Sequence, residues 1–231
     1  MKKHVFFDLD NTLWDFDASS MLAFEKLFKD FHLINYNIAS AQQFHDAYMG
    51  YNEHLWELYR QGEVDKAFLK KERFRLPLHD FGVDDESLAY EIGEHYTYWS
   101  PRLVALVPHA IELLEHLRQD NGIHLITNGF AEVQNVKIKE SGIDRYIDTM
   151  TVSEEIGIKK PDPRIFKYAL EKADAKAEDS LMVGDDLQVD VLPAKAVGMR
   201  QCFFNRKDIT HNEIIDMEIR DLAELFLRVK S

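Results

Sequence analysis

Hydrophobic and polar residues follow a helical pattern through the first half of this chain, after one short apolar run. From Ala18 to Trp99 apolar side chains recur every three or four positions, which is the period of an amphipathic helix. The pattern predicts four helices, over residues 18–31, 41–59, 65–76 and 84–99. Pro77 is expected to end the third helix, because proline disfavours a helical residue before it. No convincing strand pattern occurs between Trp14 and Val107.

Short apolar runs alternate with helical patterns in the rest of the chain. Together with the first run, they predict strands buried on both faces, at 5–8, 123–127, 147–152, 181–183 and 201–204. Further helices are predicted over 108–118, 132–141, 162–173, 188–197 and 221–229. This alternation predicts an α/β fold with a doubly wound parallel sheet. Because the first strand stands alone before the helical block, we expect residues 1–14 and 106–231 to form the α/β catalytic core and residues 15–105 to be a helical insertion.

Composition and charge narrow the classes of partner. The chain has 231 residues, of which 45% are hydrophobic, which suffices for a folded core. Its net charge of -13 argues against a nucleic-acid polymer as partner, and no apolar run is long enough to span a membrane. The single cysteine, Cys202, excludes an internal disulfide and fits a reducing, cytoplasmic location. The oligomeric state does not follow from these features.

Polar side chains follow the predicted strands at the points where the strands end. In open parallel sheets, ligands bind beyond the carboxyl ends of the strands, so we expect these residues to meet. Two acids placed together repel each other, and a cation is therefore expected between them. The set comprises Asp8, Asp10, Thr127, Asn128, Lys160, Asp185 and Asp190.

These residue types indicate chemistry on a phosphoryl group. Carboxylates from Asp8 and Asp185 suit Mg²⁺, and no paired His or Cys spacing suggests zinc. A metal ion, a lysine and a threonine hydroxyl can hold and neutralise phosphoryl oxygens. Without a Ser-His or Cys-His pair, the expected nucleophile is the carboxylate of Asp8, with Asp10 as the acid and base. Lys160 would balance the charge, with Lys159 as the weaker candidate.

Four short motifs occur in a fixed order along the chain. They are Asp8-Leu9-Asp10-Asn11-Thr12, the apolar strand into Thr127-Asn128-Gly129, Lys160-Pro161-Asp162-Pro163, and Gly184-Asp185 through Asp190. Together they resemble the motifs of the haloacid-dehalogenase (HAD) superfamily, which carries a small helical cap between its first two motifs. The resemblance implies a Rossmann-like core, Asp8 as nucleophile and Asp10 as acid and base. It also implies phosphate binding by Thr127 and Lys160, with Asn128 beside them, and Mg²⁺ on Asp8, the Asp10 carbonyl and Asp185.

The second acid of the first motif favours one activity within this superfamily. Members that dehalogenate lack it, so Asp10 implies a phosphatase acting through a phospho-aspartate. The flanking residues from Asp10 to Phe16, with Ile126 to Gly129, resemble the pyrimidine/house-cleaning 5'-nucleotidase branch. A Mg²⁺-dependent phosphomonoester hydrolase acting on a small phosphate ester, with nucleoside 5'-monophosphates as expected substrates, is therefore implied. The alternatives are a sugar-phosphate or phosphoglycolate phosphatase, a phosphomutase, and a phospho-accepting signalling domain.

Three features keep two interpretations each. Asp190 can orient a neighbouring site residue or cap a helix. Trp14 can form a wall of the substrate pocket or belong to the core. A basic cluster between Lys66 and Arg75 can attract an anionic substrate or be an ordinary solvated helix face.

Overall fold

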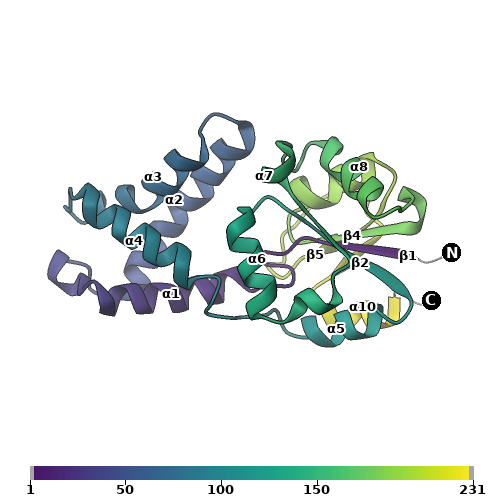
Figure 1. The fold of residues 1–231 in the computed structure, drawn as a ribbon, viewed down its shortest axis with the longest axis horizontal. Helices are drawn as coiled ribbons and strands as arrows, with labels where there is room; N and C mark the ends of the chain where they lie inside the picture. The colour runs from purple at the N-terminus through teal and green to yellow at the C-terminus, as the bar shows by residue number, and fades with distance from the viewer. Residues whose placement is uncertain (1–2, 229–231) are drawn as a thin grey trace. The chain divides into compact units, whose positions relative to one another are not determined.

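Among the described residues, six parallel strands form one sheet in the first of the two units into which the chain divides (Figure 1). The computed structural model describes residues 3–228, apart from the side chain of Leu227. The first unit contains the chain up to Phe16 and from Ala105 onward, and the second spans Asp17–Val104. The strands are β1 (Lys3–Phe7), β2 (Asn121–Thr127), β3 (Thr149–Val152), β4 (Ser180–Gly184), β5 (Arg200–Phe204) and β6 (Met217–Ile219). Their order is β3-β2-β1-β4-β5-β6, with every neighbouring pair parallel.

Helices cover both faces of this sheet. Val5 and Phe7 of β1 point into a core shared with α5 and the C-terminal helical turns, whereas Phe6 points into a core shared with α8 and α9, as the period of two along a strand requires. Figure 1 shows α5 and α10 on one side of the sheet and α8 on the other. The helices are α5 (Ala110–Leu117), α6 (Ala131–Glu140), α7 (Ser153–Ile156), α8 (Pro163–Lys172), α9 (Leu192–Ala196) and α10 (Leu225–Arg228). The single turns are η2 (Ile143–Tyr146), η3 (Ala177–Asp179), η4 (Leu187–Val191) and η5 (Leu222–Glu224).

The predicted fold class is confirmed, with local corrections. Strand β6 was missed because it has only three residues and carries no apolar run. The helix predicted over 188–197 consists of two pieces: η4 is a π-helical turn, and α9 follows it with Pro193 in its first turn. The last predicted helix starts as the 3₁₀ turn η5, which Asp221 and Glu224 close as a capping box. Its predicted end, Val229, lies outside the described residues.

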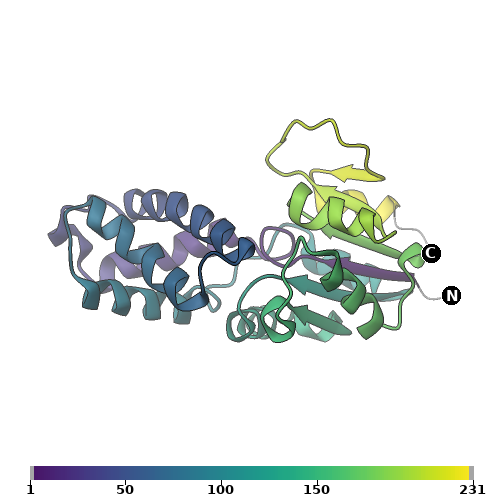
Figure 2. The ribbon, with the colours of Figure 1, turned by 90° about the horizontal axis from the view of Figure 1, so that it is seen from above.

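The second unit contains four helices and a short 3₁₀ turn around an apolar core of its own. They are α1 (Phe16–Asp30), η1 (Leu33–Tyr36), α2 (Ala41–Gln61), α3 (Lys66–Asp80) and α4 (Glu86–Trp99). Figure 2 shows these helices lying alongside one another. Ser40, Asp65 and Asp85 cap α2, α3 and α4 by accepting a backbone N–H three residues on. As expected, no described residue between 17 and 104 lies in a strand.

One helix boundary in this unit was predicted wrongly. Helix α3 does not stop at Pro77 but continues to Asp80. Pro77 and Leu78 are both buried, and Leu78 belongs to the apolar core of the unit. Packing of the last helical turn therefore outweighs the local preference of proline, since most helical stability in proteins comes from tertiary packing.

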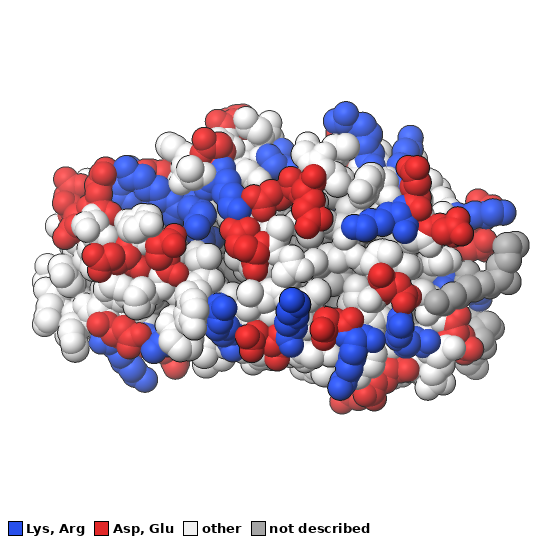
Figure 3. Space-filling model, viewed as in Figure 1, with Lys and Arg blue, Asp and Glu red and all other residues white. Residues whose placement is uncertain are grey.

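Acidic and basic side chains both occur across the face shown in Figure 3. Several members of the basic cluster between Lys66 and Arg75 are paired with acids. Lys70 lies 3.3 Å from Glu94, Lys71 3.0 Å from Glu86, and Arg75 2.6 Å from Glu72. These pairs compensate the charge of the exposed members, as expected for a solvated helix face, whereas Arg73 is buried. None of the helices within residues 3–228 combines the length and the hydropathy that a membrane span requires.

Candidate active site

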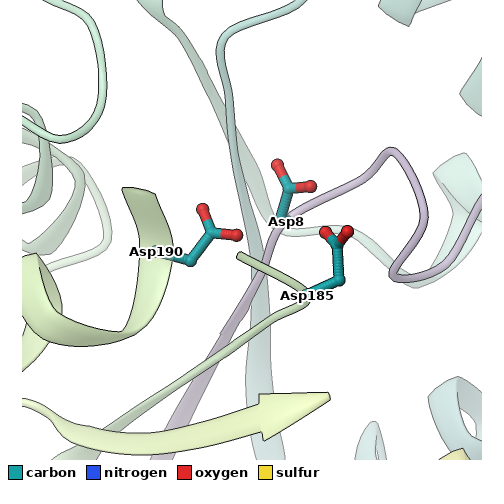
Figure 4. Close-up of side chains that lie close together, drawn as sticks. All are labelled: Asp8, Asp185 and Asp190. Atoms are coloured by element: carbon teal, nitrogen blue, oxygen red, sulfur yellow. The ribbon is translucent and has the colours of Figure 1, made fainter. Parts of the chain in front are cut away.

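Three carboxylates converge at the carboxyl edge of the sheet (Figure 4). Asp8 directly follows β1, Asp185 directly follows β4, and Asp190 lies on η4. One oxygen from each lies within 4.8 Å of the others. Strands β1 and β4 are neighbours in register, and the N–H of Asp8 donates to the carbonyl of Val183 over 2.9 Å. The hydrogen bonding between β1 and β4 therefore continues into the site and fixes the backbone of Asp8.

A buried lysine joins two of these carboxylates. Lys160 Nζ donates to Asp8 over 2.5 Å and to Asp190 over 2.6 Å, and its side chain is only 3% exposed. Burial works to lower the pKa of Lys160, but the two carboxylates outweigh it and raise this pKa, so the ammonium stays charged. Burial raises the pKa of Asp8 to about 7, although the Lys160 ammonium acts in the opposite direction. The cation expected beside Asp8 is thus present.

Asp185 has a different environment from the other two acids. Its carboxylate accepts a hydrogen bond from the Thr12 hydroxyl at 3.3 Å, and no ammonium group of the described residues forms an ion pair with it. Burial, followed by the nearby charges of Asp8 and Asp190, raises the pKa of Asp185 well above its usual value. A carboxylate held in this way lacks a positive partner, which a metal ion would supply.

Asp190 orients the lysine. One of its oxygens accepts from Lys160, and the other accepts the N–H of Asp186 at 3.2 Å. Gly184 makes this approach feasible, because a Cβ at that position would lie 2.4 Å from the Cβ of Asp190. Asp186 instead caps η4 by accepting the N–H groups of Gln188 and Val189. Of the two predicted roles for Asp190, the geometry favours orientation of a neighbour, and helix capping falls to Asp186.

Thr127 and Asn128 follow β2 but use their side chains differently. The Thr127 hydroxyl accepts from the N–H of Gly129 at 3.0 Å and from Gln134 at 2.7 Å. Its own proton is therefore free to point at a ligand oxygen. The Asn128 amide forms two 2.8 Å hydrogen bonds with the backbone of Lys160. Asn128 was predicted to bind phosphate, but its side chain is engaged in fixing the loop that carries the lysine.

The pocket-wall interpretation of Trp14 is wrong in this structure. Its side chain is completely buried and belongs to the apolar core with Leu9, Leu13 and Val107. Its backbone N–H donates to the carbonyl of Leu9 over 2.9 Å. A completely buried ring offers no face to a substrate, so the structure favours the core interpretation left open from the sequence.

Sequence reasoning missed three side chains that touch the predicted site residues. Thr12 donates to Asp185, and Gln134 and Lys137 of α6 both donate to Asp10. The signal available in the sequence was weak: Gln134 and Lys137 are three residues apart, and hence on one face of the predicted helix after the second motif. Nothing in the sequence indicated which acid they would meet.

The charges of the site leave room for a divalent cation. Asp8, Asp10, Asp185 and Asp190 face two ammonium groups, on Lys160 and Lys137. When all four acids are ionised, two negative charges remain uncompensated. Opposite ligands of an octahedral Mg²⁺ are about 4.2 Å apart, so oxygens within 4.8 Å of one another need only small adjustments. The donor set, all oxygen, also fits Mg²⁺ rather than zinc.

The fold is α/β, and a cluster of acids with a buried lysine lies at the carboxyl ends of its parallel sheet. Residues 2–198 match the model of the haloacid dehalogenase-like hydrolase family. The chain belongs to this family, and it is a hydrolase with phosphatases among its relatives. The predicted resemblance is thereby confirmed.

Three relatives show how far the similarity extends. The pyrimidine 5'-nucleotidase YjjG of Escherichia coli is 32% identical over 202 residues, covering 87% of this chain and 85% of YjjG. The pyrimidine 5'-nucleotidase PynA of Streptococcus pneumoniae is 27% identical, covering 88% and 84%. The magnesium-bound crystal structure of the HAD-hydrolase YfnB of Bacillus subtilis superposes with a TM-score of 0.87 at 27% identity, covering 99% of this chain and 98% of YfnB.

Proposed function

We propose that this protein is a Mg²⁺-dependent phosphomonoester hydrolase that works through a phospho-aspartate on Asp8. The observation that carries the proposal is the placement of Asp8, Asp185 and the Asp190-oriented Lys160 at one edge of the sheet. Asp8, Asp185 and the carbonyl of Asp10 would hold Mg²⁺, which neutralises phosphoryl oxygens when bound. Thr127 and Lys160 would bind the same oxygens from the protein side.

The reaction proceeds in two displacements at phosphorus. The Asp8 oxygen that is not bonded to Lys160 attacks phosphorus, the ester P–O bond breaks, and Asp10 gives its proton to the leaving alkoxide. A water molecule then attacks the phosphorus of phospho-Asp8 and gives a proton to Asp10. The bond between phosphorus and Asp8 breaks, which releases inorganic phosphate and restores both acids.

The proposed substrates are nucleoside 5'-monophosphates, with pyrimidine nucleotides first. The support is the similarity to YjjG and PynA, both named as pyrimidine 5'-nucleotidases. We assign residues 17–104 the role of the helical cap that governs the choice of substrate, because this unit is inserted between β1 and α5. We also propose that the enzyme acts in the cytoplasm, where its buried thiol, Cys202, stays reduced.

Release of inorganic phosphate tests this function. It is measured for uridine, cytidine and adenosine 5'-monophosphates, ribose 5-phosphate and phosphoglycolate, with Mg²⁺ and with a chelator. We expect Asp8→Asn to abolish release for every substrate, while a mutase would yield an isomer instead of phosphate. Turnover at the wild-type rate in Asp8→Asn would refute the role of Asp8 as the nucleophile.

The covalent intermediate has its own test. In Asp10→Asn supplied with 2,4-dinitrophenyl phosphate, the first displacement needs no acid because dinitrophenolate leaves without a proton, whereas the second displacement lacks its base. We therefore expect phosphate bound to protein after a rapid quench, released by neutral hydroxylamine as acyl phosphates are. Asp8→Asn is the matched control and should bind none. A phosphoprotein that persists for minutes in the wild type would instead indicate a signalling domain.

A further inference from the structure

Two side chains of α6 hold the carboxylate of Asp10 from outside the four sequence motifs. Gln134 Nε2 donates to Asp10 Oδ2 over 2.8 Å, and Lys137 Nζ donates to Asp10 Oδ1. The two donors are three residues apart on the helix and therefore share a face. Each takes one of the two carboxylate oxygens, so together they fix the orientation of the carboxylate plane. Each oxygen keeps a second lone pair for a proton.

The side chain of Lys137 is buried, and its ammonium group contacts Asp10. Lys137 is 4% exposed, and its ammonium lies 5.5 Å from the centre of the Trp14 ring and 5.7 Å from that of Phe16. Among the described residues, Asp10 is its only ion-pair partner. Burying an ammonium group costs several kcal/mol unless it is paired. The lysine is therefore committed to Asp10, and the aromatic side chains after the first motif confine it there.

The glutamine is also held by its surroundings. Its amide nitrogen donates both to Asp10 and to the hydroxyl of Thr127, at 2.7 Å. A Cβ on Gly129 would lie 2.0 Å from that nitrogen, so the space that Gln134 crosses exists only because residue 129 is glycine. Gln134 thereby links the acid of the first motif to the hydroxyl of the second.

We propose that Gln134 and Lys137 are positioning residues that aim Asp10 at the leaving oxygen of the substrate. This inference rests on the proposed function, in which Asp10 protonates the departing alkoxide while the P–O bond breaks. An alkoxide needs that proton, whereas 2,4-dinitrophenolate leaves without it. Loss of the two donors must therefore slow substrates in proportion to the basicity of their leaving groups.

The test is a leaving-group series measured in variants of the full chain. We measure kcat/KM for 2,4-dinitrophenyl, 4-nitrophenyl and phenyl phosphates and uridine 5'-monophosphate, at Mg²⁺ concentrations that saturate each variant. The value of kcat/KM reports on substrate binding and the first displacement, so slow hydrolysis of phospho-Asp8 does not obscure it. In Lys137→Met and Gln134→Leu we expect about a 100-fold loss for the nucleotide, as for an impaired general acid, and little loss for the dinitrophenyl ester.

Matched variants separate positioning from a general structural effect. Lys139→Met makes the same change at an exposed position two residues further along α6 and should leave the whole series unchanged. Lys137→Arg keeps the charge and should restore part of the nucleotide activity. Gly129→Ala should displace the Gln134 amide and reproduce the Gln134→Leu profile. The double variant Gly129→Ala/Gln134→Leu should be no worse than either of its single variants.

Failure of the positioning role can be distinguished from failure of the proposed function. Equal losses for all four substrates in Lys137→Met, or no loss for any, would overturn the positioning role while Asp8→Asn could still abolish turnover. Activity retained in Asp8→Asn would overturn the proposed function first. Thermal unfolding of each variant shows whether it is folded, and the ratio of dinitrophenyl to nucleotide kcat/KM keeps its meaning even where the amount of folded protein falls.

Discussion

At the scale of single residues, Asp185 shows the conflict between stability and the proposed metal site. Its carboxylate is buried near two other acids and has only the hydroxyl of Thr12 as a side-chain partner among the described residues. Burial and these neighbours raise its pKa, so keeping it ionised at neutral pH destabilises the metal-free protein. A neutral group of the same size would remove that penalty.

We therefore expect Asp185→Asn to stabilise the metal-free protein and to abolish its stabilisation by Mg²⁺. A gain of about 1 kcal/mol would raise Tm by ~2–4 °C in a chain of this size. Thermal unfolding with chelator and with Mg²⁺ measures both effects. Asp186→Asn is the control, since this neighbour caps η4 and asparagine is an equally good cap; its response to Mg²⁺ should persist. A variant Asp185→Asn that still gains Tm with Mg²⁺ would contradict the assigned ligand.

Asp8 makes the effect of Mg²⁺ depend on pH. Its pKa is raised from 3.8 to about 7, chiefly by burial. A folded state that holds its proton more tightly than the unfolded chain loses stability as pH rises between these two values. Mg²⁺ must displace the protons that burial favours on Asp8 and Asp185, so its binding strengthens as pH rises. We expect the increase of Tm on adding Mg²⁺ to grow from pH 5 to pH 7. Equal increments at pH 5 and pH 7 would show that Asp8 is already ionised.

At the scale of elements, close contact between β4 and η4 sets the position of Lys160. Gly184 ends β4, and the side chain of Asp190 occupies the space where a Cβ would stand. The π-helical turn widens the chain at this point: the N–H of Val191 reaches the carbonyl of Asp186 at 3.3 Å, five residues back. π-turns are rare and occur often at functional sites.

The substitution Gly184→Ala should disturb this contact specifically. Its methyl group would overlap with the Cβ of Asp190, at 2.4 Å, so η4 must shift and the lysine loses an oriented partner. We expect kcat for phosphate release to fall about 100-fold, as small displacements of catalytic groups do. Gly50→Ala is the control, because Gly50 lies inside α2 with nothing within 4 Å of an added Cβ. It should raise the free energy of unfolding by about 0.5–1 kcal/mol at unchanged kcat. Wild-type kcat in Gly184→Ala would refute the role of the contact.

Helices and strands were predictable from the sequence where a pattern within one segment specifies them. The alternating apolar runs predicted five of the strands, because strands buried on both faces need continuous apolar residues. The end of α3 was not predictable, since burial of Leu78 depends on partners from other helices. The π-helical form of η4 was hidden for a similar reason: it follows from the fit of Asp190 against Gly184, not from the sequence of the turn alone.

At the scale of the whole molecule, the two chain segments that flank the helical unit are hydrogen-bonded to each other within the sheet-containing unit. The N–H of Asp15 donates to the carbonyl of Ala105, and the N–H of Val107 to the carbonyl of Leu13, both at 2.9 Å. The insertion therefore begins and ends at neighbouring points of the first unit. Each unit has an apolar core of its own.

This arrangement predicts that the first unit can fold alone. A chain in which a short Gly/Ser linker joins Phe16 to Ala105 should unfold cooperatively and still gain Tm with Mg²⁺, because Asp8, Asp185 and Lys160 all belong to that unit. Circular dichroism during heating, with Mg²⁺ and with chelator, measures both. A broad, non-cooperative transition would show that the helical unit is needed for the fold of the first.

The sequence by itself determined the fold class and the family, and it pointed to the acids and the lysine that the structure brings together, because these depend on local patterns and on residue types at the ends of strands. Only the tertiary structure decided which charges meet. Lys137 is 127 residues away from Asp10 in sequence, Asn128 fixes the backbone of Lys160, and Trp14 is enclosed by the core. Such pairings arise from packing of β1 beside β2 and β4, and no pattern within a single segment encodes them.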